Sequence, residues 1–315
     1  MTRFLLKRLL GGLLVMWAVA TLVFFMLRIV PGDPLAAMLF DVDPAMADVL
    51  RHKYGLDQSM FIQYIKWFGN ILQGDFGTSI YGSRIPVSQV LLEALPRTLS
   101  LAALSFTVAL LIAIPAGIIS ALKKDSAWDH SVTVVAFLGL SMPDFWLGIL
   151  LIIIFAATLK WLPAIGYVPI SEGFWPWLEH LILPAIAAGT AFSAIIARMI
   201  RSSMLEVLNT DYMRVAQAKG LYQRTLILVH AFPNALIPVV TVMGIAFALL
   251  MSQTVVIENV FAIKGLGRVL IQGILNRDYP IVQGAILVVS AIFVGANLLV
   301  DLLYTVIDPR IRYDS

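Results

Sequence analysis

The fold is decided by one polar stretch, which reads Arg198-Met-Ile-Arg201-Ser-Ser-Met-Leu-Glu-Val-Leu-Asn209-Thr210-Asp211-Tyr212-Met-Arg214-Val-Ala216-Gln-Ala218-Lys219-Gly220-Leu221 and runs on to Asn234-Ala-Leu-Ile-Pro238. It is the long polar interruption in the second half of an otherwise apolar chain. Because long apolar runs flank it on both sides, it must leave the membrane between two spans.

A short helix is predicted inside this stretch, over residues 209–220. Asn209, Thr210 or Asp211 can cap its start. Gly220 can adopt the left-handed conformation that ends many helices. Ala216 and Ala218 are small enough to let another surface approach closely. A short polar helix held between two spans is suited to contact with a protein outside the membrane.

The composition is that of an integral membrane protein. Of the 315 residues, 60% are hydrophobic and 13% are charged, whereas a soluble domain is normally about 25% charged. The net charge of +3 gives no reason to expect a nucleic-acid partner. The chain has no cysteine, and its histidines match no metal-ligand spacing, so no metal site is predicted. It also lacks the glycine-rich loop that binds ATP phosphates in many ATPases.

Six membrane spans are expected, with both termini on the same side. The first apolar run, from Leu9 to Leu27, lies between Arg8 and Arg28 and is interpreted as a retained anchor rather than a cleaved signal peptide. The other five predicted spans are Thr98–Leu122, Ser131–Leu159, Leu181–Ile200, Pro233–Ile257 and Ile281–Tyr304. Lys and Arg are concentrated in the segments that lie on the same side of the membrane as the 198–238 stretch. Because positive charge marks the cytoplasmic side, this stretch and both termini are expected in the cytoplasm.

Three further features concern helix shape and packing. Pro143 lies in the middle of the third span and predicts a kink or a broken helix there. A helix with an aromatic apolar face is expected from about Met60 to Gln73, ahead of Gly74, and an earlier one from Asp43-Pro44 to about Gly55. Small residues four apart favour close helix packing, at Ala113 with Gly117, Gly244 with Ala248 and Ala291 with Gly295.

Several motifs of the chain resemble those of a known protein family. The 198–238 stretch is similar to the cytoplasmic loop of bacterial ABC-importer permeases, and closest to the dipeptide/oligopeptide/nickel branch, first-type ("B") subunit. Matching motifs along the chain are Pro31-Gly32-Asp33-Pro34, Gly55-Leu56-Asp57-Gln58, Gly74-Asp75-Phe76-Gly77, Ser141-Met142-Pro143, Gly265-Leu266-Gly267-Arg268, Arg277-Asp278-Tyr279-Pro280 and Asp308-Pro309-Arg310-Ile311-Arg312. So many matches in one order make the resemblance specific.

The resemblance implies an all-α polytopic membrane protein with the type I ABC-importer permease fold and six transmembrane helices. It divides the chain into an N-terminal anchor plus external segment (1–93), a permease core (94–305) with a cytoplasmic coupling hairpin (201–232), and a cytoplasmic tail (306–315). The implied partners are a paralogous second permease, two cytoplasmic ATPase subunits that hold the ATP and Mg, and a periplasmic or lipid-anchored solute-binding protein. This chain itself is expected to bind no cofactor and to lie in the bacterial inner membrane.

Site residues follow from the motifs and from charge at membrane depth. The residues expected to couple the chain to its ATPases are Asp211, Tyr212, Arg214, Ala216, Ala218, Lys219, Gly220, Asn234 and Pro238. Ionisable or polar residues inside spans are functional candidates, which makes Asp144, Gln253 and Glu258 candidates for lining the path. Asp301 is expected to form a structural ion pair with Arg310 or Arg312.

The chain departs from the family pattern at three places, which limits any fine substrate assignment. Gln217 stands where Arg is usual, Pro233 where Arg is usual, and Ile263-Lys264-Gly265 where Trp-Pro-Gly is usual. Short peptides are the expected cargo; nickel chelates and glutathione-like compounds remain alternatives. A stand-alone secondary transporter is the alternative from another class, although that class usually needs a second, repeated half. No covalent chemistry is expected of this chain.

Overall fold

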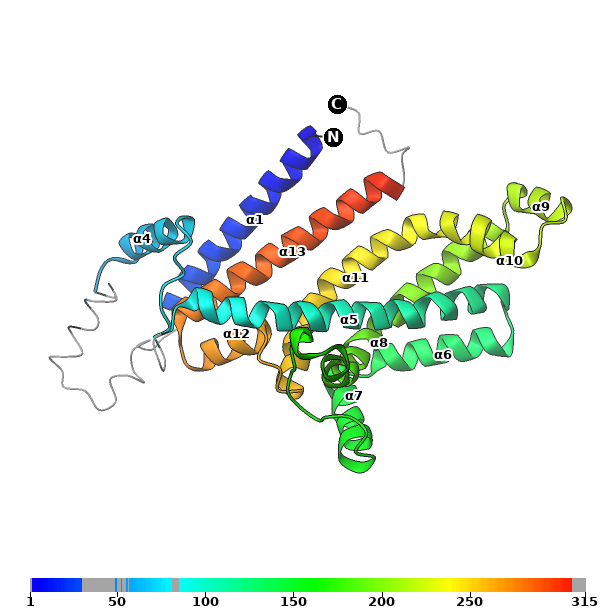
Figure 1. Cartoon of the computed structure of the whole chain (residues 1–315). Helices are drawn as coiled ribbons and strands as arrows, with labels where there is room; N and C mark the ends of the chain where they lie inside the picture. The colour runs from blue at the N-terminus through cyan, green and yellow to red at the C-terminus, as the bar shows by residue number, and fades with distance from the viewer. Residues whose placement is uncertain are drawn as a thin grey trace. The chain divides into compact units, whose positions relative to one another are not determined.

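The chain is described from a computed structural model (Figure 1), which covers residues 2–29, 49, 52, 55, 57–80 and 85–307, without the side chains of 2–5, 301 and 303–307. The described part is almost wholly helical, and its residues fall into two units. Unit 1 comprises residues 1–98 and 264–294, and unit 2 comprises 99–263 and 295–315. Of the predicted helix from Asp43 to Gly55, the structure describes residues 49 and 52, which are helical, and residue 55, which is in a turn, while the Pro31–Pro34 motif lies outside the described residues.

Unit 1 contains the first helix and the segment after it. Helix α1 runs over Thr2–Ile29 and α4 over Met60–Leu72. The unit also includes the start of α5 (Val87–Leu122), α12 (Leu266–Leu275) and most of α13 (Tyr279–Ile307). Its core is formed by Val87, Leu91, Ala94, Leu266, Ile281 and Ala285.

The aromatic face of α4, which the sequence predicted, packs against α1. The Tyr64 hydroxyl accepts a hydrogen bond from Trp17 Nε1 at 3.1 Å and lies 2.8 Å from Thr21 Oγ1. The Tyr64 ring stacks on Phe25, with ring centres 5.5 Å apart. Aromatic pairs of this kind add to the stabilisation from buried area alone, so α4 is fixed to the first helix by several contacts.

Two of the motifs form helix starts in unit 1. The backbone N–H of Leu266 donates to Thr98 Oγ1 at 2.8 Å, which caps α12. Asp278 precedes α13, is 3% exposed, and accepts a hydrogen bond from the Ser79 hydroxyl. It also accepts the backbone N–H of Ile281 at 3.3 Å. The motif residues at 265–268 and 277–280 therefore place the beginnings of two helices.

Unit 2 is a helical bundle that continues from α5. Its helices are α6 (Ala127–Ser141), α7 (Asp144–Leu151), α8 (Phe174–Leu208), α9 (Asp211–Ala218), α10 (Gln223–Thr225) and α11 (Phe232–Val260). A short 3₁₀ turn covers Ile170–Glu172, and π-helical stretches cover Ile152–Thr158 and Leu226–Ala231. The core groups Leu101, Leu181, Leu183, Ala187, Ala188, Ile257, Phe261 and Ile263.

The third predicted span is broken at Pro143, as expected. Met142 and Pro143 are both extended, with ψ of 127° and 134°. Helix α6 and the stretch Asp144–Thr158 meet there at an angle of 100°. Five other helices are long and apolar enough to cross a membrane, and the bent pair makes a sixth if it is counted as one span. The predicted number of six spans therefore agrees with the described helices.

Several helices continue beyond the predicted spans. Helix α5 has 36 residues and α8 has 35, and at about 1.5 Å per residue each exceeds the thickness of a bilayer core. Helix α8 continues through the charged residues from Arg198 to Leu208. The first part of the polar stretch, from Arg198 to Leu208, is thus an extension of a long apolar helix rather than a loop.

Small residues produce close helix contacts at two of the three predicted pairs. A side-chain carbon added to Gly117 would lie 2.7 Å from the carbonyl oxygen of Ala197 in α8, and one added to Gly244 would lie 2.4 Å from Val300. The same carbon at Gly295 would meet none of the described atoms within 4 Å. The pair Ala291 with Gly295 therefore makes no close contact with the described part of the chain.

Candidate functional site

The predicted short helix is α9, and it lies beyond the adjoining ends of α8 and α11 in unit 2 (Figure 1). Thr210 has the extended backbone of an N-cap, but its Oγ1 donates to the Val207 carbonyl at 2.5 Å instead of capping α9. Asp211 occupies the first turn. Gly220 follows the helix with φ of +76°. Such a φ strains residues that have a side chain, so the sequence prediction of a glycine terminator is confirmed.

A buried residue and a group of hydrogen bonds attach α9 to the chain that follows it. Met213 is 2% exposed and anchors α9 in the interior of the protein. The Tyr212 hydroxyl donates to the His230 carbonyl at 3.4 Å. Asn234 Nδ2 donates to the same carbonyl at 2.7 Å and to the Tyr212 hydroxyl at 3.2 Å. The structure thus brings together Tyr212 and Asn234, which are 22 residues apart, and it fixes α9 to the start of α11.

The remaining predicted residues of this site are spread differently. Arg214 Nη1 donates to Asp211 Oδ1 at 3.2 Å, and both side chains are well exposed. Such a surface pair contributes at most about 1 kcal/mol. Ala216 is half-buried, while Ala218, Lys219 and Gly220 are exposed. Pro238 lies within α11, half-buried, and takes no part in the contacts between Tyr212 and Asn234.

Exposed apolar residues accompany the small ones and were missed by the sequence analysis. Val215 is 54% exposed, Leu221 39% and Tyr222 85%. We call the exposed set Tyr212, Val215, Ala218, Gly220, Leu221 and Tyr222 the α9 surface. Contiguous exposed apolar groups rimmed by polar ones typically mark an interaction site. The apolar positions flanking the small residues could have indicated this surface from the sequence.

A groove lies between the end of α5 and the residues that follow α8. It has a volume of about 410 Å³ and is lined by Leu122, Leu208, Gln217, Leu221, Gln223, Leu226 and Ile227. It therefore joins the end of α5 to α9 and to the π-helical stretch after α10. Leu221 belongs both to this groove and to the α9 surface, so the two features adjoin.

An ion pair between a buried carboxylate of α6 and a partly exposed arginine of α8, which the sequence did not predict, lies beside the end of α5 in unit 2. Arg201 donates from Nε to Asp129 Oδ1 at 2.8 Å and from Nη2 to Asp129 Oδ2 at 2.6 Å. Asp129 is 4% exposed and also accepts hydrogen bonds from the Ser120 hydroxyl and from the backbone N–H of Asp125. We call Ser120, Asp125, Asp129 and Arg201 the Asp129 cluster.

One signal for this cluster was present in the sequence. Ser126-Ala-Trp-Asp129 has the spacing of a capping box ahead of an apolar run, and Ser126 does accept the backbone N–H of Asp129, at 3.4 Å. The ion pair itself joins residues 72 positions apart. No local pattern predicts a contact over that distance.

The three pathway candidates have different environments. Asp144 begins α7, and its Oδ2 is buried without a hydrogen-bond partner among the described residues. Gln253 is exposed on α11. Glu258 is fully buried, and its side chain or backbone is already engaged in interactions within the protein. Of the three, Asp144 is the one with an unmatched buried oxygen.

The last predicted site falls outside what is described. Asp301 lies in α13, but its side chain is not described, and Arg310 and Arg312 lie beyond the described residues. The predicted ion pair at the C-terminal end therefore stays a prediction. Among the described residues, no group of three or more His, Asp or Glu side chains is arranged to hold a metal ion.

Comparison with known proteins agrees with the motifs. Residues 113–313 match the family described as binding-protein-dependent transport system inner membrane component, and residues 1–102 match the N-terminal region of such components. A putative peptide transport system permease protein of Brucella abortus is 44% identical over 315 residues, which is 100% of both chains.

Two further relatives have more specific names. The di/tripeptide transport system permease protein DppB of Pseudomonas aeruginosa is 40% identical, covering 99% of each chain. The oligopeptide transport system permease protein AppB of Bacillus subtilis is 37% identical, covering 99% of this chain and 100% of that one.

The fold is shared with a solved structure. An inward-facing form of the MetNI methionine ABC transporter matches with a TM-score of 0.59 at 16% identity, covering 70% of this chain and 97% of that chain. The family matches together span most of the sequence, and the relatives match it end to end. The resemblance inferred from the motifs is thereby confirmed: the chain belongs to the family of binding-protein-dependent transport system inner membrane components, and it is a multi-pass permease subunit of a bacterial ABC transporter.

Proposed function

We propose that this chain forms one half of the transmembrane path of an ATP-driven importer of short peptides, and that the α9 surface is its contact with a cytoplasmic ATPase. The observation that carries the proposal is the combination of exposure and attachment at α9. Its outer residues are open to a partner, while Met213 and the contacts from Tyr212 and Asn234 attach it to the bundle. A force applied to α9 is therefore transmitted to α11.

The proposed mechanism is mechanical. Two ATPase subunits bind ATP and close, which draws the α9 helices of this chain and of a paralogous second permease together. The spans then tilt, and the path opens toward a loaded solute-binding protein on the outer side. Hydrolysis of ATP by the partners reverses the movement. Small residues at Ala218 and Gly220 allow the close approach that such a contact needs.

The peptide cargo is proposed from the relatives. The names of all three relatives above refer to peptide, oligopeptide or di/tripeptide transport. In this proposal residues 94–305 form the permease core, after an anchor and external segment at 1–93 and before a tail at 306–315. Both termini and the 201–232 hairpin lie in the cytoplasm, and the chain lies in the inner membrane.

The path itself is proposed to pass Asp144. Its unmatched, buried Oδ2 is suited to the ammonium group of a peptide, because a buried acceptor without a partner is costly unless a ligand satisfies it. Gln253 and Glu258 are weaker candidates for the same path. Uptake competition with peptides that lack the free amino group tests this role, and an Asp144→Asn variant with unchanged preference contradicts it.

The central experiment changes Gly220 in the assembled importer. Gly220→Asp adds a negative charge at the C-terminal end of α9, where the helix dipole disfavours it. A side-chain carbon added at Gly220 would meet none of the described atoms within 4 Å. We expect the chain to insert normally and the uptake of labelled tripeptide to fall by about tenfold, the equivalent of 1.4 kcal/mol of lost contact.

Gly220→Asn is the matched control, because asparagine tolerates the left-handed backbone and carries no charge. We expect this variant to keep most of the uptake. Membrane levels of both variants are measured by immunoblot. Full uptake by Gly220→Asp contradicts the ATPase contact, and a lack of tripeptide uptake by the wild type contradicts the peptide cargo.

A further inference from the structure

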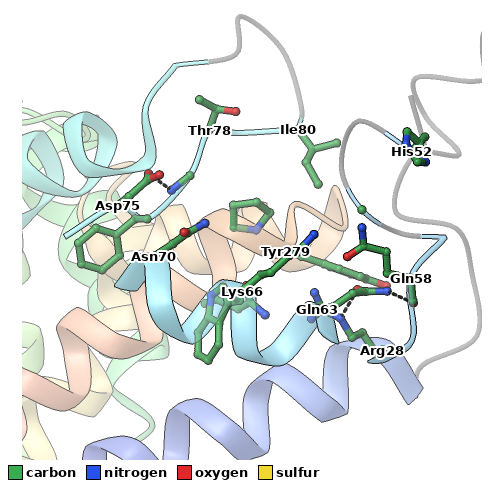
Figure 2. Close-up of a pocket in the computed structure, with 16 residues that line it drawn as sticks. Arg28, His52, Gln58, Gln63, Lys66, Asn70, Asp75, Thr78, Ile80 and Tyr279 are labelled. Atoms are coloured by element: carbon green, nitrogen blue, oxygen red, sulfur yellow. Dashed lines mark hydrogen bonds between the residues drawn. The ribbon is translucent and has the colours of Figure 1, made fainter. Parts of the chain in front are cut away.

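Unit 1 contains a polar pocket that neither the α9 surface nor the pathway candidates explain (Figure 2). Its volume is about 370 Å³, and it is formed by the end of α1, one face of α4, residues 75–80 and the start of α13. Figure 2 shows Gln63, Lys66 and Asn70 following one another along α4 at the pocket. Small-molecule sites in proteins have volumes of roughly 300 to 1,000 Å³, so the pocket is large enough for a ligand.

The charges at the pocket favour an anion. Arg28 and Lys66 both line it. The Arg28 guanidinium is held in place, since its Nε donates to Gln63 Oε1 at 2.9 Å and its Nη1 donates to a carbonyl of its own helix at 3.2 Å. The one carboxylate among the described lining residues, Asp75, already accepts the backbone N–H of Gly77 at 2.8 Å. A second carboxylate, Asp57, is not among the lining residues; it pairs with His52 at 2.6 Å and interacts electrostatically with Lys66. The guanidinium of Arg28 and the ammonium of Lys66 are both groups that bind carboxylates by charge-assisted hydrogen bonds.

Two amide groups at the pocket are left unmatched. Gln283 is 4% exposed, and its Nε2 has no hydrogen-bond partner among the described residues. Gln58 Oε1 is likewise buried without a partner there. Both residues line the pocket. Buried polar groups are rarely left unpaired in native proteins, so an unmatched donor and an unmatched acceptor at one pocket point to a ligand that supplies both.

We propose that this pocket binds a short peptide by its C-terminal carboxylate. A peptide group offers an N–H and a C=O, which match the acceptor of Gln58 and the donor of Gln283, and the terminal carboxylate pairs with Arg28 and Lys66. The inference rests on the proposed peptide cargo. It adds a second binding site, on the segment between the first two spans and the start of the last one, to the path through the core.

The test is equilibrium binding to the full-length chain in nanodiscs of uncharged lipid. The probes are radiolabelled trialanine and its C-terminal amide, which differ in the carboxylate alone. We expect the wild-type chain to bind the acid about tenfold more tightly than the amide, as a charge-assisted hydrogen bond predicts. Equal binding of the two probes, or no binding of either, overturns the proposal.

Two variants locate the binding. Lys66→Met, at an exposed position of α4, should remove most of the preference for the acid. Gln283→Leu should lower the affinity for both probes by roughly three- to tenfold, which corresponds to the loss of one hydrogen bond. Gln272→Leu is the control for the latter, because Gln272 is an exposed amide on α12 that is not among the lining residues. Wild-type affinity in Lys66→Met and Gln283→Leu overturns the proposal.

A parallel measurement separates this inference from the proposed function. Uptake of the same labelled trialanine is measured in cells that carry the complete importer. Uptake by the wild type, together with no effect of the pocket variants on binding, overturns the pocket alone. Variants that bind trialanine normally but lose uptake also overturn it, because the pocket then serves contact with a partner protein. No uptake by the wild type contradicts the proposed cargo instead.

Discussion

The Asp129 cluster and helix α9 each contain an Asp–Arg pair in unit 2, yet the two pairs lie in opposite environments. In the cluster, a 4% exposed carboxylate is matched by a bidentate guanidinium, a hydroxyl and a backbone N–H. On α9, Arg214 and Asp211 form one exposed pair, and Tyr222 of the adjoining α9 surface is 85% exposed. A polar group that is fully matched inside the chain has no capacity left for a partner, whereas an exposed one has.

The difference separates stability from coupling. Residues of the Asp129 cluster join the end of α5, the start of α6 and the C-terminal part of α8. Residues of the α9 surface are all exposed. Changes in the cluster should therefore lower the stability of the bundle, and changes on the α9 surface should lower transport at unchanged stability. Three substitutions test this division, starting with the largest expected effect.

Arg201→Ala should destabilise the protein most. It leaves the Asp129 carboxylate buried and without its opposite charge, which costs about 3 kcal/mol or more. The measurement is thermal unfolding of the purified chain in detergent. Arg198→Ala is the control, because Arg198 is exposed one turn earlier on the same helix, and it should change stability by less than about 0.5 kcal/mol. Equal midpoints for the two variants would contradict a structural role of the cluster.

Ala218→Leu should reduce transport without reducing stability. Ala218 is exposed, so a larger side chain extends into solvent in the isolated chain. The free energy of unfolding should therefore change by less than about 0.5 kcal/mol. In the assembled importer the same side chain blocks the close approach of a partner. Tripeptide uptake should fall by about tenfold, while Ala218→Ser keeps it. Should the unfolding midpoint fall instead, Ala218 would belong with the structural residues.

Tyr212→Phe should have the smallest effect and lies between the two groups. It removes a hydroxyl that bonds the His230 carbonyl at 3.4 Å and accepts Asn234 Nδ2 at 3.2 Å. Exposed hydrogen bonds of this length contribute less than about 1 kcal/mol. Amide hydrogen exchange within α9 should become faster, because α9 is less firmly attached, while global unfolding stays the same. Tyr222→Phe is the control, and protection equal to wild type in Tyr212→Phe would show that Met213 alone holds α9.

The helices that the sequence predicted well are those with local signals. Gly220 and the polar residues at 209–211 delimit α9, Gly74 follows α4, and Pro143 breaks the third span. Backbone geometry at glycine and proline depends on the residue itself. Where neither glycine nor proline marks a helix end, the helix continues beyond the predicted span. Helix α8 extends to Leu208 because nothing in its last two turns interrupts the helix, although its charge suggested a loop.

The candidate site was predicted in part for the same reason. The α9 residues and Asn234 follow from motifs, but the contact of Tyr212 with Asn234 depends on how the chain returns after the π-helical stretch. Asp129, Arg201 and the pocket around Gln283 depend on contacts between residues far apart in sequence. Apolar periodicity contains no information about which polar residues of different helices meet.

The right-angled elbow at Met142-Pro143 has a consequence for the surroundings of the bundle. A helix that stops inside a bilayer leaves carbonyl and N–H groups that hydrocarbon cannot satisfy, so an interrupted span is tolerated where protein or water covers it. The elbow therefore marks a side of this subunit that is shielded from lipid tails. Since the chain has no cysteine of its own, a single cysteine in place of Ser141 would report directly whether water or a neighbouring subunit provides the shield.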